Sequence, residues 1–224
     1  MSTPAPEPAL ARGAGFWKRE VAWLIDALLV GALVNVVLSL PLGLLGVLGG
    51  ASSTALLGDT WNALSGGAGA EALQPLLRPL LSLLAIAVAL ATALYALFGW
   101  IYFGWMESSP RQATLGKQAL GIRVVDRAGA RISFARASAR FFAAALSWLT
   151  LNLGHALAAW TRERRALHDY LAGTRVVDAD PASAALPDWA RVLVALQLAV
   201  AGALLLLPLL LLAALLLVGG AASF

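Results

Sequence analysis

The chain contains no cysteine, only two histidines and few charged residues. Of its 224 residues, 12% are charged and 60% are hydrophobic, whereas about a quarter of residues are charged in a typical soluble domain. The absence of cysteine excludes disulfides and thiolate metal or redox sites, and two histidines are too few for a histidine-rich metal site. The low charge content excludes an ordinary soluble protein.

The excess of basic over acidic residues in the chain does not indicate nucleic-acid binding. The 16 Lys and Arg residues outnumber the 12 Asp and Glu residues, and the isoelectric point is about 10.1. The basic residues lie in segments that flank apolar runs, however, and form no basic stripe interleaved with aromatic residues. We therefore expect no nucleic-acid partner and attribute the charge to membrane topology.

Three apolar runs, over residues 21–50, 80–103 and 192–218, are each long enough to cross a bilayer core, which needs about 20 helical residues. They predict spanning helices over about 16–40, 80–106 and 187–218. Aromatic residues, such as those in "FGWIYFGWM", mark ends of the first two helices, where such rings favour the membrane interface. We expect Pro41 to end or kink the first helix.

Two similar polar segments indicate a small sheet outside the bilayer. Residues 121–126 read GIRVVD and residues 173–178 read GTRVVD. A short strand alone leaves backbone groups unpaired, so we expect residues 122–126, 131–133 and 174–177 to join in one sheet on one side of the membrane.

The distribution of Lys and Arg predicts the topology, because cytoplasmic loops carry an excess of these residues. If residues 141–160 do not cross the membrane, fifteen basic residues lie inside and one outside; if they cross, the division is ten to six. We therefore expect residues 134–160 to form a helical pair or re-entrant hairpin in the cytoplasmic leaflet, bent near residues 150–154. An ordinary 20-residue span over 141–160 remains the alternative.

These patterns predict a mainly α-helical membrane fold with three spanning helices, a re-entrant or interfacial helical pair and a small cytoplasmic β-sheet. Residues 1–15 form a disordered tail, 16–178 the membrane domain, 179–186 a linker and 187–218 an additional C-terminal transmembrane helix. The N-terminus and residues 107–140 and 161–191 are expected inside, and residues 42–79 and the C-terminus outside.

Asp26 is the most informative residue. Placing a carboxylate in a spanning helix costs free energy, so its side chain must face protein or water. Arg19, seven residues earlier, lies on the same helical face. One interpretation makes Asp26 a titrating or cation-binding carboxylate in a transport path. The other makes it a permanent ion-pair partner that fixes the helix.

The remaining polar candidates admit structural interpretations as well. His168 beside Asp169 could form a proton relay or metal site, but Asp169 could equally cap its segment and pair with an Arg. Asn152 and His155 lie at the predicted bend, where polar side chains satisfy freed backbone groups. Arg136 and Arg140, one turn apart, could face anionic headgroups or Asp26.

Enzyme motifs are absent from the sequence. The segment "TLGKQ" lacks the spacing of a phosphate-binding loop, and no nucleophile with a base, paired catalytic carboxylates or metal-ligand spacing is present. Gly116, Gly121 and Gly173 are interpreted as points where the backbone turns or packs closely. We expect no enzymatic activity and no cofactor.

Three separated blocks resemble one family. They are "REVAWLID", which places Arg19 seven residues before Asp26, "TLGKQALGIRVVDRAGARISFARASAR" and "ALHDYLAGTRVV". In this order they resemble the RDD family of small bacterial membrane proteins over residues 16–178. The family is named for one Arg and two Asp, and the resemblance assigns these to Arg19, Asp26 and Asp169.

The resemblance implies a multi-pass protein of the bacterial plasma (inner) membrane with a cytoplasmic N-terminus. Transport is the usual suggestion for the family, so we expect a small transporter or ion-coupled permease component. The alternative is a non-catalytic membrane adaptor or scaffold that organises a partner protein or lipid. Because so few spans make a thin transporter, we expect a homo-oligomer or a larger membrane complex in the lipid bilayer.

The polar residues of the family are expected to meet at the cytoplasmic end of the first helix. In this hypothesis Asp26, Asp169, Arg19, Arg136 and Arg140 form one network, since a buried carboxylate without a cationic neighbour is strongly destabilising.

Overall fold

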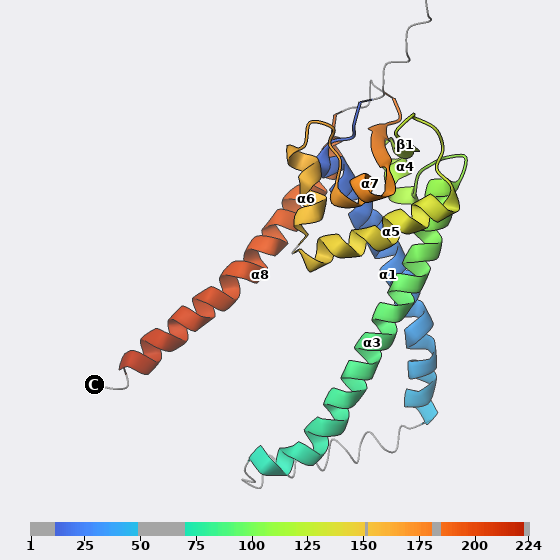
Figure 1. The fold of residues 1–224 in the computed structure, drawn as a ribbon. Helices are drawn as coiled ribbons and strands as arrows, with labels where there is room; N and C mark the ends of the chain where they lie inside the picture. Colours follow the sequence, from blue (N-terminus) through green and yellow to red (C-terminus); the bar gives the residue numbers. More distant parts are fainter. Residues whose placement is uncertain (1–11, 49–69, 151, 181–184, 222–224) are drawn as a thin grey trace, which may run out of the picture. The chain divides into compact units, whose positions relative to one another are not determined.

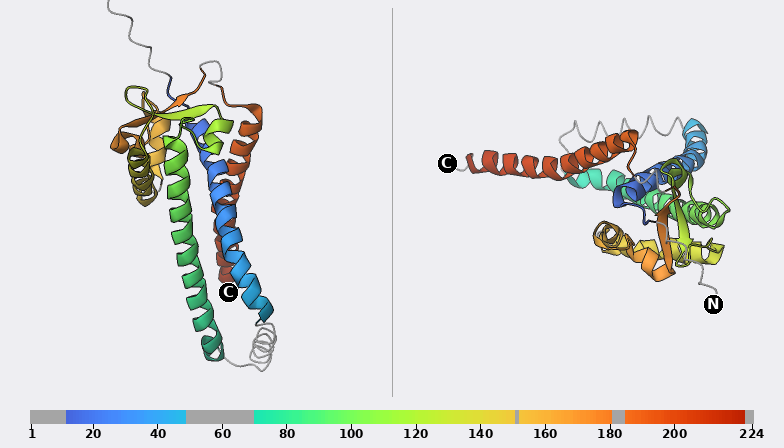
Figure 2. Two further views of the ribbon diagram at one scale, coloured as in Figure 1. Left: turned by 90° about the vertical axis from the view of Figure 1, so that its right-hand side faces the viewer. Right: turned by 90° about the horizontal axis from the view of Figure 1, so that it is seen from above.

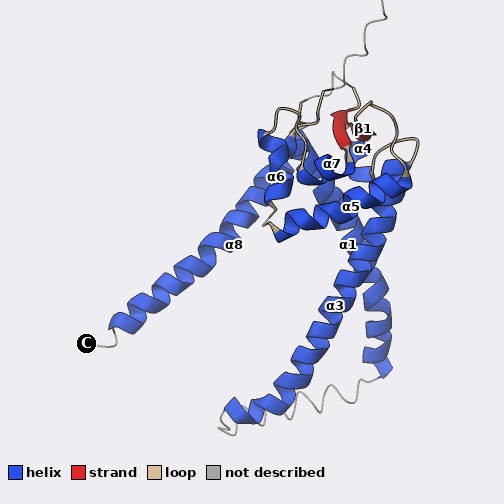
Figure 3. Ribbon diagram, viewed as in Figure 1, coloured by secondary structure: helices blue, strands red, loops and turns tan. Residues whose placement is uncertain are grey.

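The computed structural model describes residues 12–48, 70–150, 152–180 and 185–221. In this part the chain is mainly helical with one small sheet (Figures 1 and 3). The elements in chain order are α1 (Phe16–Leu48), α3 (Ala70–Ser108), α4 (Leu115–Ala119), β1 (Ile122–Asp126), α5 (Phe134–Leu149), α6 (Leu153–Trp160), α7 (Leu167–Ala172), β2 (Thr174–Asp178) and α8 (Asp188–Ala221). The chain divides into two compact units, Met1–Ile25 with Met106–Phe224, and Asp26–Trp105. We call them the polar unit and the helical unit.

Among the described residues, three helices are long and apolar enough to cross a membrane, as the sequence predicts. The candidate spans are Phe16–Pro41, Leu77–Ser108 and Asp188–Leu211. The helices extend beyond the predicted ends, since α1 passes through Pro41 to Leu48 and α3 begins at Ala70. Pro41 therefore does not end α1, and Pro208 likewise lies inside α8. Such prolines are tolerated in membrane helices, where neighbouring groups satisfy the freed backbone.

The two similar segments form the sheet. β1 and β2 pair antiparallel with Val124 opposite Val176 and Ile122 opposite Asp178, and they lie side by side in Figure 2. The predicted third strand, residues 131–133, is wrong. The backbone N–H groups of Ala128 and Ala130 donate to the Asp126 carboxylate at 2.9 and 2.8 Å. Asp126 N–H donates to Ala130 O at 2.9 Å, but residues 131–133 form no strand and lead directly into α5.

The other edge of β2 is paired by the segment just before α1. Ala14 N–H donates to Val176 O at 2.9 Å, Asp178 N–H donates to Arg12 O at 3.1 Å, and Gly13 forms a bridge with Val177. Residues 12–15, which the sequence analysis assigned to a disordered tail, are therefore ordered, and residues 1–11 of that prediction lie outside the described part. This pairing satisfies backbone groups that an edge strand would otherwise leave open.

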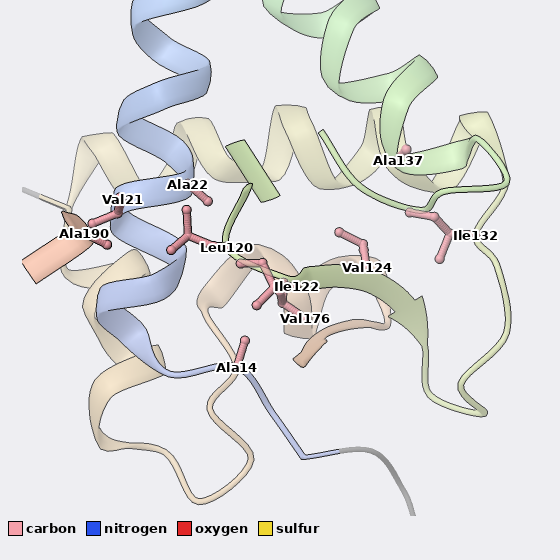
Figure 4. Close-up of a cluster of buried hydrophobic side chains, with 10 residues drawn as sticks. All are labelled: Ala14, Val21, Ala22, Leu120, Ile122, Val124, Ile132, Ala137, Val176 and Ala190. Carbon is pink, nitrogen blue, oxygen red and sulfur yellow. The ribbon is translucent and has the colours of Figure 1, made fainter. Parts of the chain in front are cut away.

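The hydrophobic core of the polar unit lies between α1 and the sheet (Figure 4). Val21 of α1 is fully buried, as are Val124 of β1 and, to within 1%, Ile122 and Val176. Each such side chain contributes about 1.5–3 kcal/mol when removed from water. The core therefore holds the beginning of α1 against the sheet.

The segment over residues 134–160 is broken into α5 and α6, so an unbroken span does not form. Asn152 adopts a left-handed conformation with φ of 66° between the helices, inside the predicted bend. A Cβ on Gly154 would lie 2.3 Å from Ser147 Oγ, so only glycine permits this approach of α6 to α5. α5 also packs against α7.

Candidate functional site

Asp169 is the centre of a buried polar cluster in the polar unit. Its side chain is fully buried at the first turn of α7, where Oδ2 accepts a hydrogen bond from Ala166 N–H at 2.9 Å. Arg19 of α1 donates to the same oxygen at 2.5 Å, and Arg140 of α5 donates to Oδ1. One carboxylate thus joins α1, α5 and α7.

Arg140 extends the cluster to two further elements. Its Nε lies 3.1 Å from Oε2 of Glu107, at the end of α3, and Lys117 of α4 binds Oε1 of the same carboxylate at 2.6 Å. Arg140 also donates to Thr174 Oγ1 of β2 at 3.2 Å. We define the charged cluster as Arg19, Arg140, Lys117, Glu107 and Asp169. With three cations and two carboxylates, it carries a formal charge of +1.

The surroundings of the charged cluster keep Asp169 ionised. Burial opposes ionisation, but the charges of Arg19 and Arg140 outweigh this effect and hold the pKa of Asp169 well below its ordinary value. Burial likewise disfavours charged Arg140, and Asp169 with Glu107 reverses this, so the pKa of Arg140 is raised. Asp169 is therefore suited to holding structure and not to exchanging protons near neutral pH.

The two histidines lie against each other beside this cluster. Their ring centroids are 4.9 Å apart. Burial lowers the pKa of His155 to about 4, assisted by the charges of Arg19 and Arg140. Burial also holds the pKa of His168 well below its ordinary value. Both rings are neutral at pH 7, so the 3.6 Å approach of His168 Nε2 to Asp169 is not an ion pair under those conditions.

Asp26 lies in the helical unit and has a different partner. Its side chain is fully buried, and Tyr102 of α3 donates from its hydroxyl to Asp26 Oδ1 at 2.7 Å. Both residues belong to candidate membrane spans. The two aspartates therefore have unlike environments, since two guanidinium groups bind one and a phenol hydroxyl binds the other.

Comparison with protein families identifies the family of this chain. The model of the RDD family matches residues 13–173. The chain belongs to the RDD family. A Bacillus subtilis (strain 168) relative, named uncharacterized protein YxaI, is 28% identical over 171 residues, which cover 75% of this chain and 99% of that protein. No solved structure matches the chain.

Of the three residues that the resemblance assigns to the family name, the structure brings Arg19 and Asp169 into contact, and Arg140 binds the same carboxylate. The structure places Arg136 elsewhere, 3.5 Å from the Asp126 carboxylate with a half-exposed side chain. Asp26 belongs to the helical unit, so a single network with Asp26 stays a prediction. The network hypothesis was wrong about Arg136. That residue shares a helical face with Arg140 but lies one turn, about 6 Å, nearer the beginning of α5, where it approaches Asp126 at the end of β1.

The other predicted positions are mainly points of backbone geometry. Gly121 and Gly173 have φ of 63° and 64°, and Gly173 ends α7. Gly116 is buried within α4. Asn152 precedes α6 and accepts the N–H of His155 and Ala156 through its backbone oxygen.

The sequence analysis did not identify several of the buried polar residues in this unit. Glu107, Lys117 and Thr174 have no spacing that links them to Asp169. Lys18 and Asp178 form a separate buried pair at 2.8 Å that ties α1 to the end of β2. One sequence feature could have identified two of them. Lys18 and Glu107 lie at the ends of apolar runs, where a charged side chain is either in the headgroup layer or paired with another group of the protein.

Described His, Asp and Glu side chains form no group of three arranged to hold a metal ion. In the described part, the charged cluster is an ion-pair network among protein groups that cross-links helices by buried charge-assisted hydrogen bonds.

Proposed function

We propose that the protein is a small ion-coupled transporter, or the membrane component of one, and that Asp26 is its ion-binding carboxylate. The observation that carries this proposal is the hydrogen bond from Tyr102 to a fully buried Asp26 inside a candidate span. Intramembrane carboxylates that face protein or water commonly mark ion and proton pathways.

The Tyr102 hydroxyl suits a carboxylate that changes its charge. It donates to ionised Asp26, and its oxygen accepts from Asp26 once that residue is protonated. The same contact is therefore available in both states. Asp169, by contrast, would leave the buried Arg19 without its carboxylate and Arg140 with Glu107 alone if it were protonated, which supports a fixed structural role for that residue.

Reconstitution in liposomes tests this function. We expect Asp26→Asn to abolish uptake of H⁺ or of monovalent cations such as Na⁺ driven by an imposed gradient, while thermal unfolding in detergent stays near that of wild type. Asp188→Asn is the matched control, because its side chain is 95% exposed at the start of α8. Unchanged flux in Asp26→Asn, or no flux in wild type, would refute the proposal.

A membrane adaptor is the second candidate, and a specific observation favours it. In the candidate-span windows of α3 and α8, no residue is buried, and large apolar side chains such as Leu84 and Leu207 are more than half exposed. These surfaces fit lipid, a second copy or a partner helix. Asp26→Asn would then reduce the mass of the complex in mild detergent without any flux to lose.

For either function we propose a multi-pass protein of the plasma (inner) membrane in which the N-terminus and residues 107–140 and 161–191 are cytoplasmic. The basic-residue count supports this orientation. The natural absence of cysteine permits single-cysteine labelling. Cysteines at Ser138 and Thr161 should be protected from an impermeant reagent in intact cells, and labelling from outside would reverse the orientation.

A further inference from the structure

A groove lies between the beginning of α1 and the end of α6, within the polar unit. Its volume is about 540 Å³. Gly15, Phe16 and Trp17 line one side, and three alanines with Trp160 line the other. Arg164, on the loop after α6, is its charged lining residue. We propose that this groove binds one anionic phospholipid.

The place of the groove along α1 supports a lipid. Phe16 and Trp17 are the first residues of the candidate span Phe16–Pro41, so the groove lies at one end of that span. The exposed fractions of Trp17 and Trp160 are 43% and 73%. Tryptophan favours the headgroup region, because its ring is apolar and its N–H donates a hydrogen bond.

Charge complementarity selects an anionic headgroup. Arg164 has φ of 51°, and its Nη1 donates to Gly13 O at 3.1 Å, which holds the guanidinium beside the groove. Arg162 is exposed two residues earlier. The intervening acid, Glu163, binds Arg165 at 3.1 Å. Basic pockets at membrane helices bind phosphate headgroups in this way.

The floor of the groove suits an acyl chain. Ala156, Ala158 and Ala159 of α6 present small apolar side chains, of which Ala158 is buried and Ala159 exposed. We assign the phosphate to Arg164 and one acyl chain to this alanine surface. This site is independent of the proposed transport, because Asp26 and Tyr102 do not line it.

Native mass spectrometry of the full chain in detergent tests the site, with phosphatidylglycerol and phosphatidylcholine of identical acyl chains as probes. We expect wild type to retain more phosphatidylglycerol. Arg164→Gln should lower that retention about fivefold, the effect of losing one Arg near an anionic headgroup. Arg131→Gln, on the exposed loop after β1, is the charge-matched control and should retain the wild-type preference.

A second variant keeps the test decisive if Arg164→Gln loosens the contact with Gly13. Ala159→Leu fills the groove from an exposed position without changing charge, and it should lower retention of both lipids. In liposomes, brominated phosphatidylglycerol should quench the fluorescence of wild type more than that of Trp160→Phe. Equal retention of the two lipids by wild type, equal effects of Arg164→Gln and Arg131→Gln, or a second copy of the chain displacing lipid would overturn the proposal.

Discussion

Replacing Asp169 by Asn should destabilise the protein severely. The amide preserves the shape of the side chain but removes the negative charge that two cations share. Arg19 and Arg140, whose side chains are only 10% and 8% exposed, would then lose the carboxylate that they share. Arg140 would keep Glu107 as a partner, and the charge of the cluster would rise from +1 to +2. Removing one partner from a buried ion pair costs about 3–5 kcal/mol, a large share of the 5–15 kcal/mol typical of a folded domain.

Equilibrium unfolding of the purified protein in detergent, followed by circular dichroism, measures this loss. Asp188→Asn is the control and should remain within about 0.5 kcal/mol of wild type, because its side chain is exposed. Replacing Asp169 and Arg140 together by Leu and Met should cost less than the sum of the two single changes, since the pair is in contact. A loss below about 1 kcal/mol for Asp169→Asn, or strictly additive losses, would refute the cross-linking role.

The pH dependence of this effect has a defined sign. The pKa of Asp169 is lower in the folded chain than in the unfolded chain, where it is about 3.9. Its ionised form therefore stabilises the fold fully above that value, and the stabilisation is lost as the pH falls toward the folded pKa. The stability difference between wild type and Asp169→Asn should shrink below about pH 4, and a constant difference would contradict the mechanism.

Three further changes have expected outcomes. Because the pKa of His155 falls from 6.5 to about 4 on folding, wild type should lose stability as the pH falls from 6.5 to 4, and His155→Phe should lose less; unfolding at several pH values checks this. Gly154→Ala should cost about 1–3 kcal/mol by thermal unfolding because its Cβ meets Ser147, whereas Gly31→Ala, with open space around it, should not. Lys18→Met should cost about 3–5 kcal/mol in the same measurement, since it leaves Asp178 buried without its cation.

Local rules predict much of this fold. Apolar length alone predicts the three candidate spans, and the repeated RVVD sequence predicts the β1–β2 pairing. The bend around Asn152 follows from polar residues interrupting an apolar segment. The prediction of a third strand was wrong because backbone N–H groups of the turn donate to the Asp126 carboxylate. Such side-chain hydrogen bonds are an alternative to pairing between strands.

Which cation binds which carboxylate is set by tertiary packing and not by sequence spacing. Arg19 lies seven residues from Asp26, and the family resemblance groups it with both aspartates. Its ion pair, however, is with Asp169, 150 positions away. The N-terminal segment pairs with β2, and the core places the first turns of α1 against the sheet. These contacts bring Arg19 to α7.

The same packing gives Asp26 and Asp169 different hydrogen-bond partners. Residue type makes Asp26 and Asp169 equivalent acids, and only the partners distinguish them. Two guanidinium groups and a backbone N–H occupy the oxygens of Asp169, which fixes its charge, whereas a phenol hydroxyl contacts Asp26 and serves either protonation state. Under the proposed function, a carboxylate that exchanges a proton must tolerate a change of charge, and the contact with Tyr102 is compatible with both states of Asp26. The two guanidinium partners of Asp169 instead favour a structural role for that residue.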